Sequence, residues 1–281
     1  MIITNNAGLP EPLVEAIKQQ THRRGDYSVT ELINPVQQTI LKRRHEAEIT
    51  EDAADRLWSL FGTAVHKALE QGNKAGITEG YIETDILGMK ISGTADLYEA
   101  GGTISDYKVT SAWSLVYGSR ETEWAAQLNA YAYLYQSLGF EVTKLQVVAI
   151  LRDWSAINAK RDPAYPQNKV EVLPIEMYSK EVTKTWLELR VGAVQKAALR
   201  LDNLPECTTA ERWETKTTYA VMQAGRKSAV IVYEELPEAE KHIAGKKGLF
   251  IETRVGEAKR CEYYCSVKDF CEQYKKEHAE K

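Results

Sequence analysis

The chain contains the segment Gly93-Thr94-Ala95-Asp96, followed after a short interval by Ser105-Asp106-Tyr107-Lys108, and these residues indicate the architecture. Both halves alternate as β-strands do, and Gly101-Gly102 between them supplies the tight turn of a hairpin. We expect the hairpin to bring the Asp96 and Asp106 carboxylates together, with Lys108 on the same strand face as Asp106. Two crowded carboxylates repel each other unless a divalent cation lies between them, and oxygen ligands suit Mg²⁺ or Mn²⁺. A lysine beside such a cation can orient water, so the segment predicts phosphodiester hydrolysis.

The elements expected around this hairpin alternate between helices and strands. A short helix over Pro12–Gln20 and a long amphipathic helix over Glu51–Gly72 precede the hairpin. The segment Asp153–Asn168 is expected to be a loop, because it contains two prolines. The expected strands are Tyr81–Ile86, Lys90–Tyr98, Thr103–Thr110, Thr143–Arg152 and Lys169–Tyr178, and the later helices are Glu121–Leu138 and Ser179–Asp202. This order predicts an α/β fold with a mixed central sheet flanked by helices.

Two further motifs lie on either side of the hairpin. Upstream, Gly62-Thr63-Ala64-Val65-His66 places His66 beside the apolar stripe of the long helix, where a surface histidine is the alternative interpretation. Downstream, Gln127 and Tyr131 share a helix face and can bond a phosphate or order the lysine. The alternative is that Tyr131 packs in the core. The four pieces in this order resemble the PD-(D/E)XK nuclease superfamily, and especially its RecB-like members.

The resemblance implies a restriction-endonuclease-like fold and a metal-dependent deoxyribonuclease. The implied ligands of the Mg²⁺ or Mn²⁺ ion are Asp96, Asp106, His66 and the backbone carbonyl of Val109. Lys108 would position the attacking water, and Gln127 and Tyr131 would support Lys108 or the scissile strand. The resemblance favours an exonuclease acting on DNA ends in phage or bacterial recombination or repair.

Two alternatives to this exonuclease stay open. One is a nuclease of the CRISPR-adaptation type that trims single-stranded DNA. The other, from a different class, is a non-catalytic nucleic-acid-binding protein with a module that a metal holds together. The resemblance implies DNA as the substrate, with a recombination annealing protein or a helicase as candidate protein partners. The chain itself has no G-x-x-x-x-G-K-[ST] phosphate loop, so we expect no helicase activity of its own.

The four cysteines all lie in the last unit of the chain, at Cys207, Cys261, Cys265 and Cys271. In a reducing cytosol, four thiols favour a metal over paired disulfides. One clustered triplet with a remote partner fits a [4Fe–4S] cluster better than the paired knuckles of structural zinc. Zinc and four unlinked buried thiols are the alternatives. We expect a nuclease domain over residues 1–204 and an iron–sulfur module over residues 205–281.

The cysteine arrangement also resembles the cluster-bearing members of the same superfamily, the AddB-type and CRISPR-associated nucleases. In those families the remote cysteine precedes the nuclease motifs, whereas Cys207 follows them here. We expect the cluster to attach the C-terminal segment to the nuclease core.

The composition is that of an ordinary globular protein, with a formal net charge of −4 over 281 residues. A negative total counts against nucleic-acid binding, but local cationic patches matter more than the sum. The candidate patches are Arg23-Arg24, Lys42-Arg43-Arg44, Arg226-Lys227 and Lys246-Lys247. There is no long apolar run and no signal-peptide pattern at the start, so we expect no membrane association and a cytoplasmic location.

Overall fold

The computed structural model describes residues 1–18, 25–72, 76–118 and 120–279. The last two residues expected for the first helix, 19–20, and the Arg23-Arg24 patch lie outside the described residues. The chain forms two compact units, Met1–Asp202 and Asn203–Lys281. No helix within the described ranges has the length and apolar character that crossing a bilayer requires.

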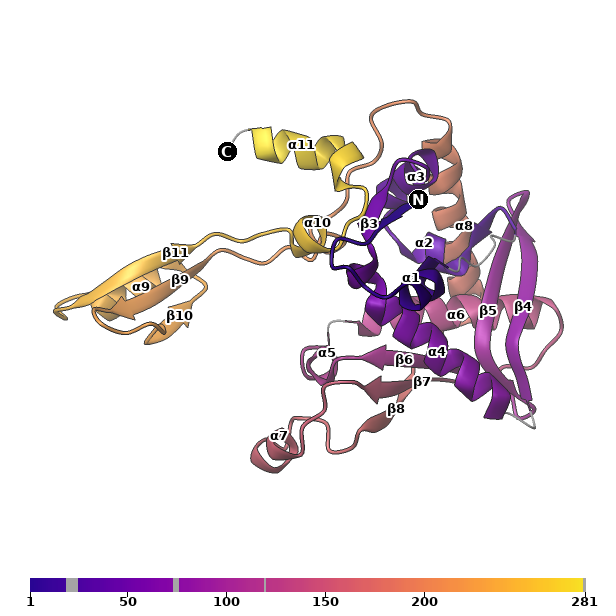
Figure 1. Ribbon diagram of the computed structural model, residues 1–281, viewed down its shortest axis with the longest axis horizontal. Coiled ribbons are helices and arrows are strands. Elements are labelled where there is room, and N and C mark those ends of the chain that lie inside the picture. The colour runs from indigo at the N-terminus through magenta and orange to yellow at the C-terminus, as the bar shows by residue number, and fades with distance from the viewer. Residues whose placement is uncertain (19–24, 73–75, 119, 280–281) are drawn as a thin grey trace. The chain divides into compact units, whose positions relative to one another are not determined.

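The first unit is built on a six-stranded mixed sheet, drawn in purple and magenta in Figure 1. Its strands are β2 (Tyr27–Ser28), β4 (Gly76–Ile86), β5 (Met89–Glu99), β6 (Thr103–Thr110), β7 (Lys144–Leu151) and β8 (Val170–Ile175). Strand β5 pairs antiparallel with β4 and β6 and parallel with β2. Strand β7 pairs parallel with β6 and antiparallel with β8. The expected mixed central sheet is confirmed.

Helices flank this sheet. The parallel strands β6 and β7 are joined through α5 (Ala112–Val116) and α6 (Glu121–Ser137), and α8 (Lys180–Ala198) packs against α6. Two short helices, α2 (Val29–Ile33) and α3 (Val36–Arg44), contact α8 as well. Fully buried side chains from the sheet and these helices form the core; the largest are Tyr135, Leu32, Ile91, Ile104, Leu128, Leu134, Leu145 and Leu187. Their burial is the main favourable term that holds helices and sheet together.

Helix α6 lies very close to β5, and glycine makes this possible. A Cβ atom at Gly93 would lie 2.8 Å from Cε1 of Tyr131, a contact that side chains cannot adopt. The phenol ring of Tyr131 therefore rests directly on the β5 backbone, and only 4% of this residue is exposed. This packing fixes the position of α6 relative to the strand that carries Asp96.

Two expectations about helices differ from the structure, and strand β4 begins at Gly76 instead of the expected Tyr81. The long helix does not begin at Glu51: Thr50–Asp52 forms strand β3, which pairs with β1 (Ile2–Thr4), and a 3₁₀ turn over Ala53–Arg56 precedes α4 (Leu57–Gly72). The side chain of Asp52 caps this turn by accepting a hydrogen bond from the backbone N–H of Ala54. No α4 side chain is fully buried in the described residues.

The second difference is in the segment expected to be a loop, Asp153–Asn168, which contains the helix α7 (Ala156–Arg161). The Ser155 hydroxyl caps this helix by accepting from the backbone N–H of Asn158. The helix ends before Pro163, so the prolines limit its length without preventing it.

The second unit contains a three-stranded antiparallel sheet with the strand order β10-β9-β11. Its strands are β9 (Thr218–Gln223), β10 (Ile231–Tyr233) and β11 (Leu249–Arg254), and α9 (Leu236–Ile243) covers one face. The cysteine-bearing end follows with α10 (Lys259–Tyr263), a 3₁₀ turn over Lys268–Phe270 and α11 (Glu272–Ala279).

Candidate functional site

Strands β5 and β6 separate at Asp96. Their ladder runs up to the pair Leu97–Ser105 and ends there. Beyond this pair, Oδ2 of Asp96 accepts a hydrogen bond of 2.6 Å from the backbone N–H of Tyr107. The carboxylate therefore takes the place of the next ladder bond and lies in the fork between the two strands.

The β4–β5 hairpin breaks its side-chain alternation at the same point. Gly93 faces α6, because a Cβ atom there would meet a tyrosine of that helix. Tyr98 also faces α6, where it stacks on another tyrosine with a centroid distance of 4.9 Å. Tyr98 lies an odd number of positions after Gly93, so strict alternation would put the two on opposite faces. One irregularity must therefore separate them.

The irregularity coincides with the position at which the β4–β5 ladder skips Glu79 and Asp96. The ladder pairs Thr78 with Leu97 and Gly80 with Ala95, which leaves Glu79 opposite Asp96. The φ angle of Glu79 is 47°, in the left-handed region that favours glycine. This strained residue turns its carboxylate toward Asp96, and local strain of this kind is concentrated at functional sites.

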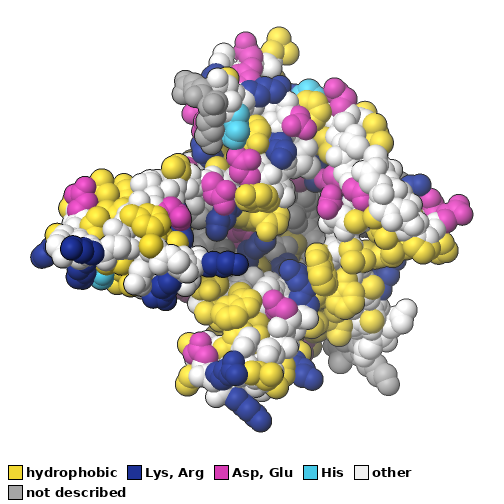
Figure 2. Space-filling view, turned by 60° about the vertical axis from the view of Figure 1, so that its left-hand side comes forward, with side chains coloured by type: hydrophobic (Ala, Val, Ile, Leu, Met, Phe, Trp, Pro, Cys, Tyr) yellow, Lys and Arg dark blue, Asp and Glu magenta, His cyan; other side chains and the backbone are white. Residues whose placement is uncertain are grey.

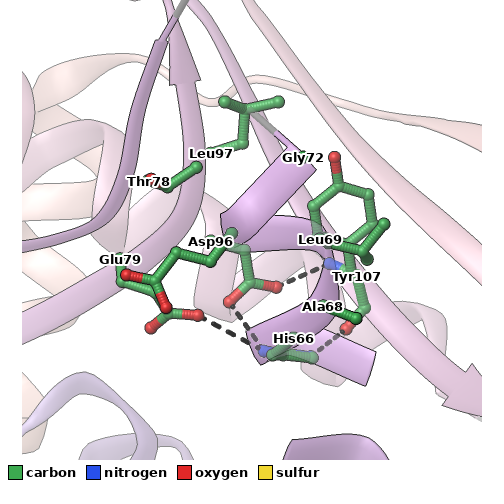
Figure 3. A pocket seen from close by; sticks show the side chains of 10 residues that line it. His66, Ala68, Leu69, Gly72, Thr78, Glu79, Asp96, Leu97 and Tyr107 are labelled. Carbon is green, nitrogen blue, oxygen red and sulfur yellow. Dashed lines mark hydrogen bonds and ion pairs between the residues drawn. The ribbon is translucent and has the colours of Figure 1, made fainter. Parts of the chain in front are cut away.

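His66 from α4 completes this cluster, as Figure 3 shows. Its Nδ1 lies 3.3 Å from Oδ1 of Asp96 and 3.7 Å from Oε1 of Glu79, and its Nε2 lies 2.9 Å from the carbonyl oxygen of Tyr107. Both ring nitrogens thus face acceptors. The hydrogen bond to Asp96 is the largest cause that raises the pKa of His66, to about 9. Without a cation the imidazole therefore carries the positive charge between the two carboxylates.

One potential ligand atom from each of His66, Glu79 and Asp96 lies within 4.8 Å of the others. The three side chains line a pocket of about 330 Å³, together with residues of α4 and with Tyr107. Burial, and then the charge of Asp96, raise the pKa of Glu79. Carboxylate and imidazole ligands at this spacing can hold a divalent cation.

Asp106 and Lys108 form a second pair on β6. Lys108 Nζ lies 2.6 Å from Oδ2 of Asp106, as expected for side chains two positions apart on a strand. Alternation puts this pair on the face opposite the side chain of Tyr107, which lines the pocket. Asp106 is only 2% exposed. Burial raises its pKa, the charge of Lys108 opposes this shift, and the charge of Asp96 adds to it.

Gln127 and Tyr131 lie next to the second pair. Gln127 Nε2 donates a hydrogen bond of 2.9 Å to the phenol oxygen of Tyr131. Burial raises the pKa of Tyr131, and the charge of Asp106 is the next cause. Tyr131 therefore belongs to the core, as in the alternative interpretation, and also adjoins Asp106.

The expected site residues fall into two adjoining groups on either side of the Tyr107 backbone. His66 and Asp96 form one group, and Asp106, Lys108, Gln127 and Tyr131 form the other. The carbonyl that contacts His66 belongs to Tyr107, whereas Val109 is not among the described residues that line the pocket.

Glu79 was missed by sequence reasoning. The expected strand began at Tyr81, so Glu79 and Gly80 lay outside it, whereas β4 begins at Gly76. With the strand extended back to Gly76, Gly80 is the available signal, because an isolated glycine inside a strand marks an irregularity or a close approach.

The four cysteines lie within the second unit, and the structure, which describes all of them, shows no disulfide. Burial raises the pKa of Cys207 to about 12, and the charges of Glu211 and of the other three cysteines add to the shift. The backbone of Cys207 is held by Gln273, whose side chain accepts from its N–H (2.9 Å) and donates to its carbonyl (3.0 Å). The remote cysteine is thus brought to the clustered three.

The search of protein-family models and the search of curated proteins each gave no match. Among solved structures, the chain is similar to the crystal structure of SSO0001, with 17% identity and a TM-score of 0.42, over 65% of this chain and 82% of that chain. It is also similar to the alkaline exonuclease LHK-Exo from Laribacter hongkongensis, with 11% identity and a TM-score of 0.37, over 66% and 93% of the two chains. For LHK-Exo in complex with dAMP the identity is 13% and the TM-score 0.38, over 60% of this chain and 88% of that chain. Each TM-score is below 0.5, so the function proposed next rests on the site itself.

Proposed function

We propose that the first unit is a deoxyribonuclease that depends on Mg²⁺ or Mn²⁺ and removes nucleotides from DNA ends. The observation that carries this proposal is the convergence of His66, Glu79 and Asp96 within 4.8 Å, beside the Asp106–Lys108 pair. The order of the motifs along the chain, which resembles that of PD-(D/E)XK nucleases, supports the same reaction.

The chemistry of the donor set fits a divalent cation. Glu79 and Asp96 are like charges opposite each other on paired strands, which destabilises a sheet unless a positive charge lies between them. His66, Glu79 and Asp96 would hold the ion, with the Tyr107 carbonyl beside them and the charge of Asp106 nearby. When bound, the ion supplies charge stabilisation to a phosphate and lowers the pKa of a bound water.

The remaining side chains would handle the attacking water and the developing charge. Lys108, about a quarter exposed, can release Asp106 and place its ammonium near a phosphate oxygen or the water. Tyr131 and Gln127 would hold Asp106 and Lys108 in position from the α6 side. Positioning by such packed groups is what makes a near-attack geometry persistent.

For the second unit, we propose a [4Fe–4S] cluster held by Cys207, Cys261, Cys265 and Cys271. Their mutual electrostatic interactions support one common site. In the sequence, one clustered triplet with a remote fourth cysteine fits such a cluster better than the paired knuckles of structural zinc.

The test is cleavage of end-labelled duplex and single-stranded DNA with Mg²⁺, Mn²⁺ or EDTA. Wild type is expected to shorten the DNA from its ends with either ion and to be inactive in EDTA. Asp106→Ala and Lys108→Ala should each lose activity by at least about 100-fold while remaining folded. Lys90→Ala, on the neighbouring strand β5, is the matched control and should stay active. An active Lys108→Ala variant would overturn the proposal and favour a non-catalytic binding protein.

A further inference from the structure

The β9–β11 sheet of the second unit carries a group of cations that the proposed active site does not use. The turn after β9, residues 224–230, and the loop before β11, residues 244–248, lie side by side, since the backbone N–H of Ala224 donates to the carbonyl of Gly248 over 3.1 Å. These two segments contain Arg226, Lys227, Lys246 and Lys247. We call these four residues the basic tip.

The basic tip differs from the other cationic patches of the sequence. In the Lys42-Arg43-Arg44 patch, Arg43 pairs with Glu31 over 2.8 Å and Arg44 bonds backbone carbonyls of its own unit. In the part of the chain that the structure describes, none of the four tip residues has an ion pair, and all four are exposed. An unpaired cationic cluster keeps its full attraction for a polyanion.

Around the β9–β11 sheet, the basic residues of the tip are separated from the acidic residues. Neither tip segment contains a carboxylate. The carboxylates further along the strands are already paired, Glu234 with Lys216 over 2.8 Å and Glu252 with Arg254 over 2.8 Å. Counted along the sequence, Glu240 on α9 is the nearest other acidic residue to the two tip segments. The tip is therefore locally positive although the whole chain is negative.

An exposed aromatic residue lies next to these cations. Phe250 is the second residue after the loop and is 49% exposed. It pairs with Met222 across the sheet, and Val232 lies on the same face. Helix α9 covers the other face, where Tyr233 contacts His242 over 2.9 Å. Figure 2 shows basic side chains at the rim of an apolar area on this module.

We propose that the basic tip binds the phosphates of single-stranded DNA and that Phe250 stacks on an unpaired base beside them. Cations beside an exposed aromatic ring are the combination by which proteins hold single strands without reading their sequence. The inference deepens the proposed function, on which it rests for the identity of the substrate, by adding a second contact with it outside the active site.

The test measures binding without cleavage. Lys108→Ala protein in EDTA is titrated against fluorescein-labelled oligo(dT), and the anisotropy is followed at several salt concentrations. Removing one cation that neutralises a phosphate should reduce the slope of log affinity against log salt by about 0.7. Replacing all four tip residues by Gln should lower the slope by about 3, and each pair alone, R226Q/K227Q or K246Q/K247Q, by about 1.4. Phe250→Ala should weaken binding about tenfold with no change of slope.

The matched control removes two exposed lysines from α11 of the same unit, as K275Q/K276Q, and should leave the slope unchanged. Circular dichroism shows whether each variant is folded. If the variant with all four replacements is unfolded, the two double variants are used for the test. An unchanged slope in the tip variants, or an equal reduction in the control, would overturn the proposal. Tip variants that bind phosphatidylserine vesicles more weakly than wild type but bind oligo(dT) equally well would also overturn the proposal. If wild type fails to cleave DNA but the tip variants still bind oligo(dT) more weakly, the proposed nuclease activity fails while this inference stands.

Discussion

Glu79 and Asp96 lie opposite each other on neighbouring antiparallel strands, and both carboxylates face Nδ1 of His66, over 3.7 and 3.3 Å. The backbone of Glu79 is strained into the left-handed region to allow this. The cation-free protein thus keeps backbone strain and part of the repulsion at one point, because protonated His66 offsets the rest, and a bound cation would take over that role. Replacing Glu79 should therefore raise the stability of the cation-free protein and lower its affinity for the cation.

Glu79→Gly is expected to stabilise the cation-free protein by about 1 kcal/mol, because glycine adopts a positive φ readily and the like-charge contact is removed. The same change should weaken Mn²⁺ binding about tenfold or more. Urea unfolding in EDTA and Mn²⁺ titration followed by electron paramagnetic resonance measure the two effects. Glu83→Gly, on the same strand without a positive φ, is the control and should destabilise by about 1 kcal/mol. Lower stability in Glu79→Gly would contradict the strain argument.

The stability of the cation-free protein should depend on pH through His66. Its pKa is raised to about 9 by Asp96 in the folded state, against 6.5 as the ordinary value. The stabilisation is therefore fully present below about pH 6.5 and is lost as the pH rises through about 9. Unfolding free energies of wild type and His66→Gln at pH 6, 8 and 10 in EDTA should converge as the pH rises. A constant difference between the two proteins would show that His66 is not protonated in this site.

The contact between β5 and α6 should be sensitive to a single methyl group. Gly93→Ala would place a Cβ atom 2.8 Å from the ring of the buried Tyr131, so we expect the protein to be destabilised by about 1–3 kcal/mol. Gly62→Ala is the contrasting variant, because no atom lies within 4 Å of a Cβ there and the residue is inside α4. It should stabilise by up to about 1 kcal/mol. Thermal unfolding of both variants is the measurement, and equal effects would argue against the close packing.

Removing one cysteine should remove the whole cluster proposed for the second unit. Cys207→Ala is expected to abolish absorbance near roughly 400 nm and to lose bound iron, because the cluster needs all four ligands. Ser266→Ala, between two of the cysteines in the sequence, is the control and should keep both. Iron and zinc analysis of purified protein decides between the alternatives. A colourless wild-type protein with one zinc per chain would contradict the iron–sulfur assignment.

The sequence predicted the sheet and the hairpin because local signals and the fold agree there. Gly101-Gly102 sets the turn, with Gly102 at a φ of 80°, and the pairing from Leu97–Ser105 to Glu99–Thr103 follows. Alternation likewise predicted that Asp106 and Lys108 would meet. These features depend only on residues close together in the chain.

The arrangement of the site depended on contacts that alternation does not encode. The ladder skips Glu79 and Asp96, and Asp96 contacts His66 of α4 while its charge also acts on the buried Asp106. The side-chain pattern of a regular strand contains no sign of this. The helix over Ala156–Arg161 was missed for a simpler reason, because the prolines were given more weight than the Ser155 cap.

The decisive measurement is the position of Mn²⁺ in crystals of the wild-type protein, found from its anomalous scattering. We expect a peak bonded to Asp96, with His66 and Glu79 as further ligands, at metal–ligand distances of about 2.0–2.3 Å. No peak at saturating Mn²⁺, or a peak that none of these three side chains contacts, would contradict it.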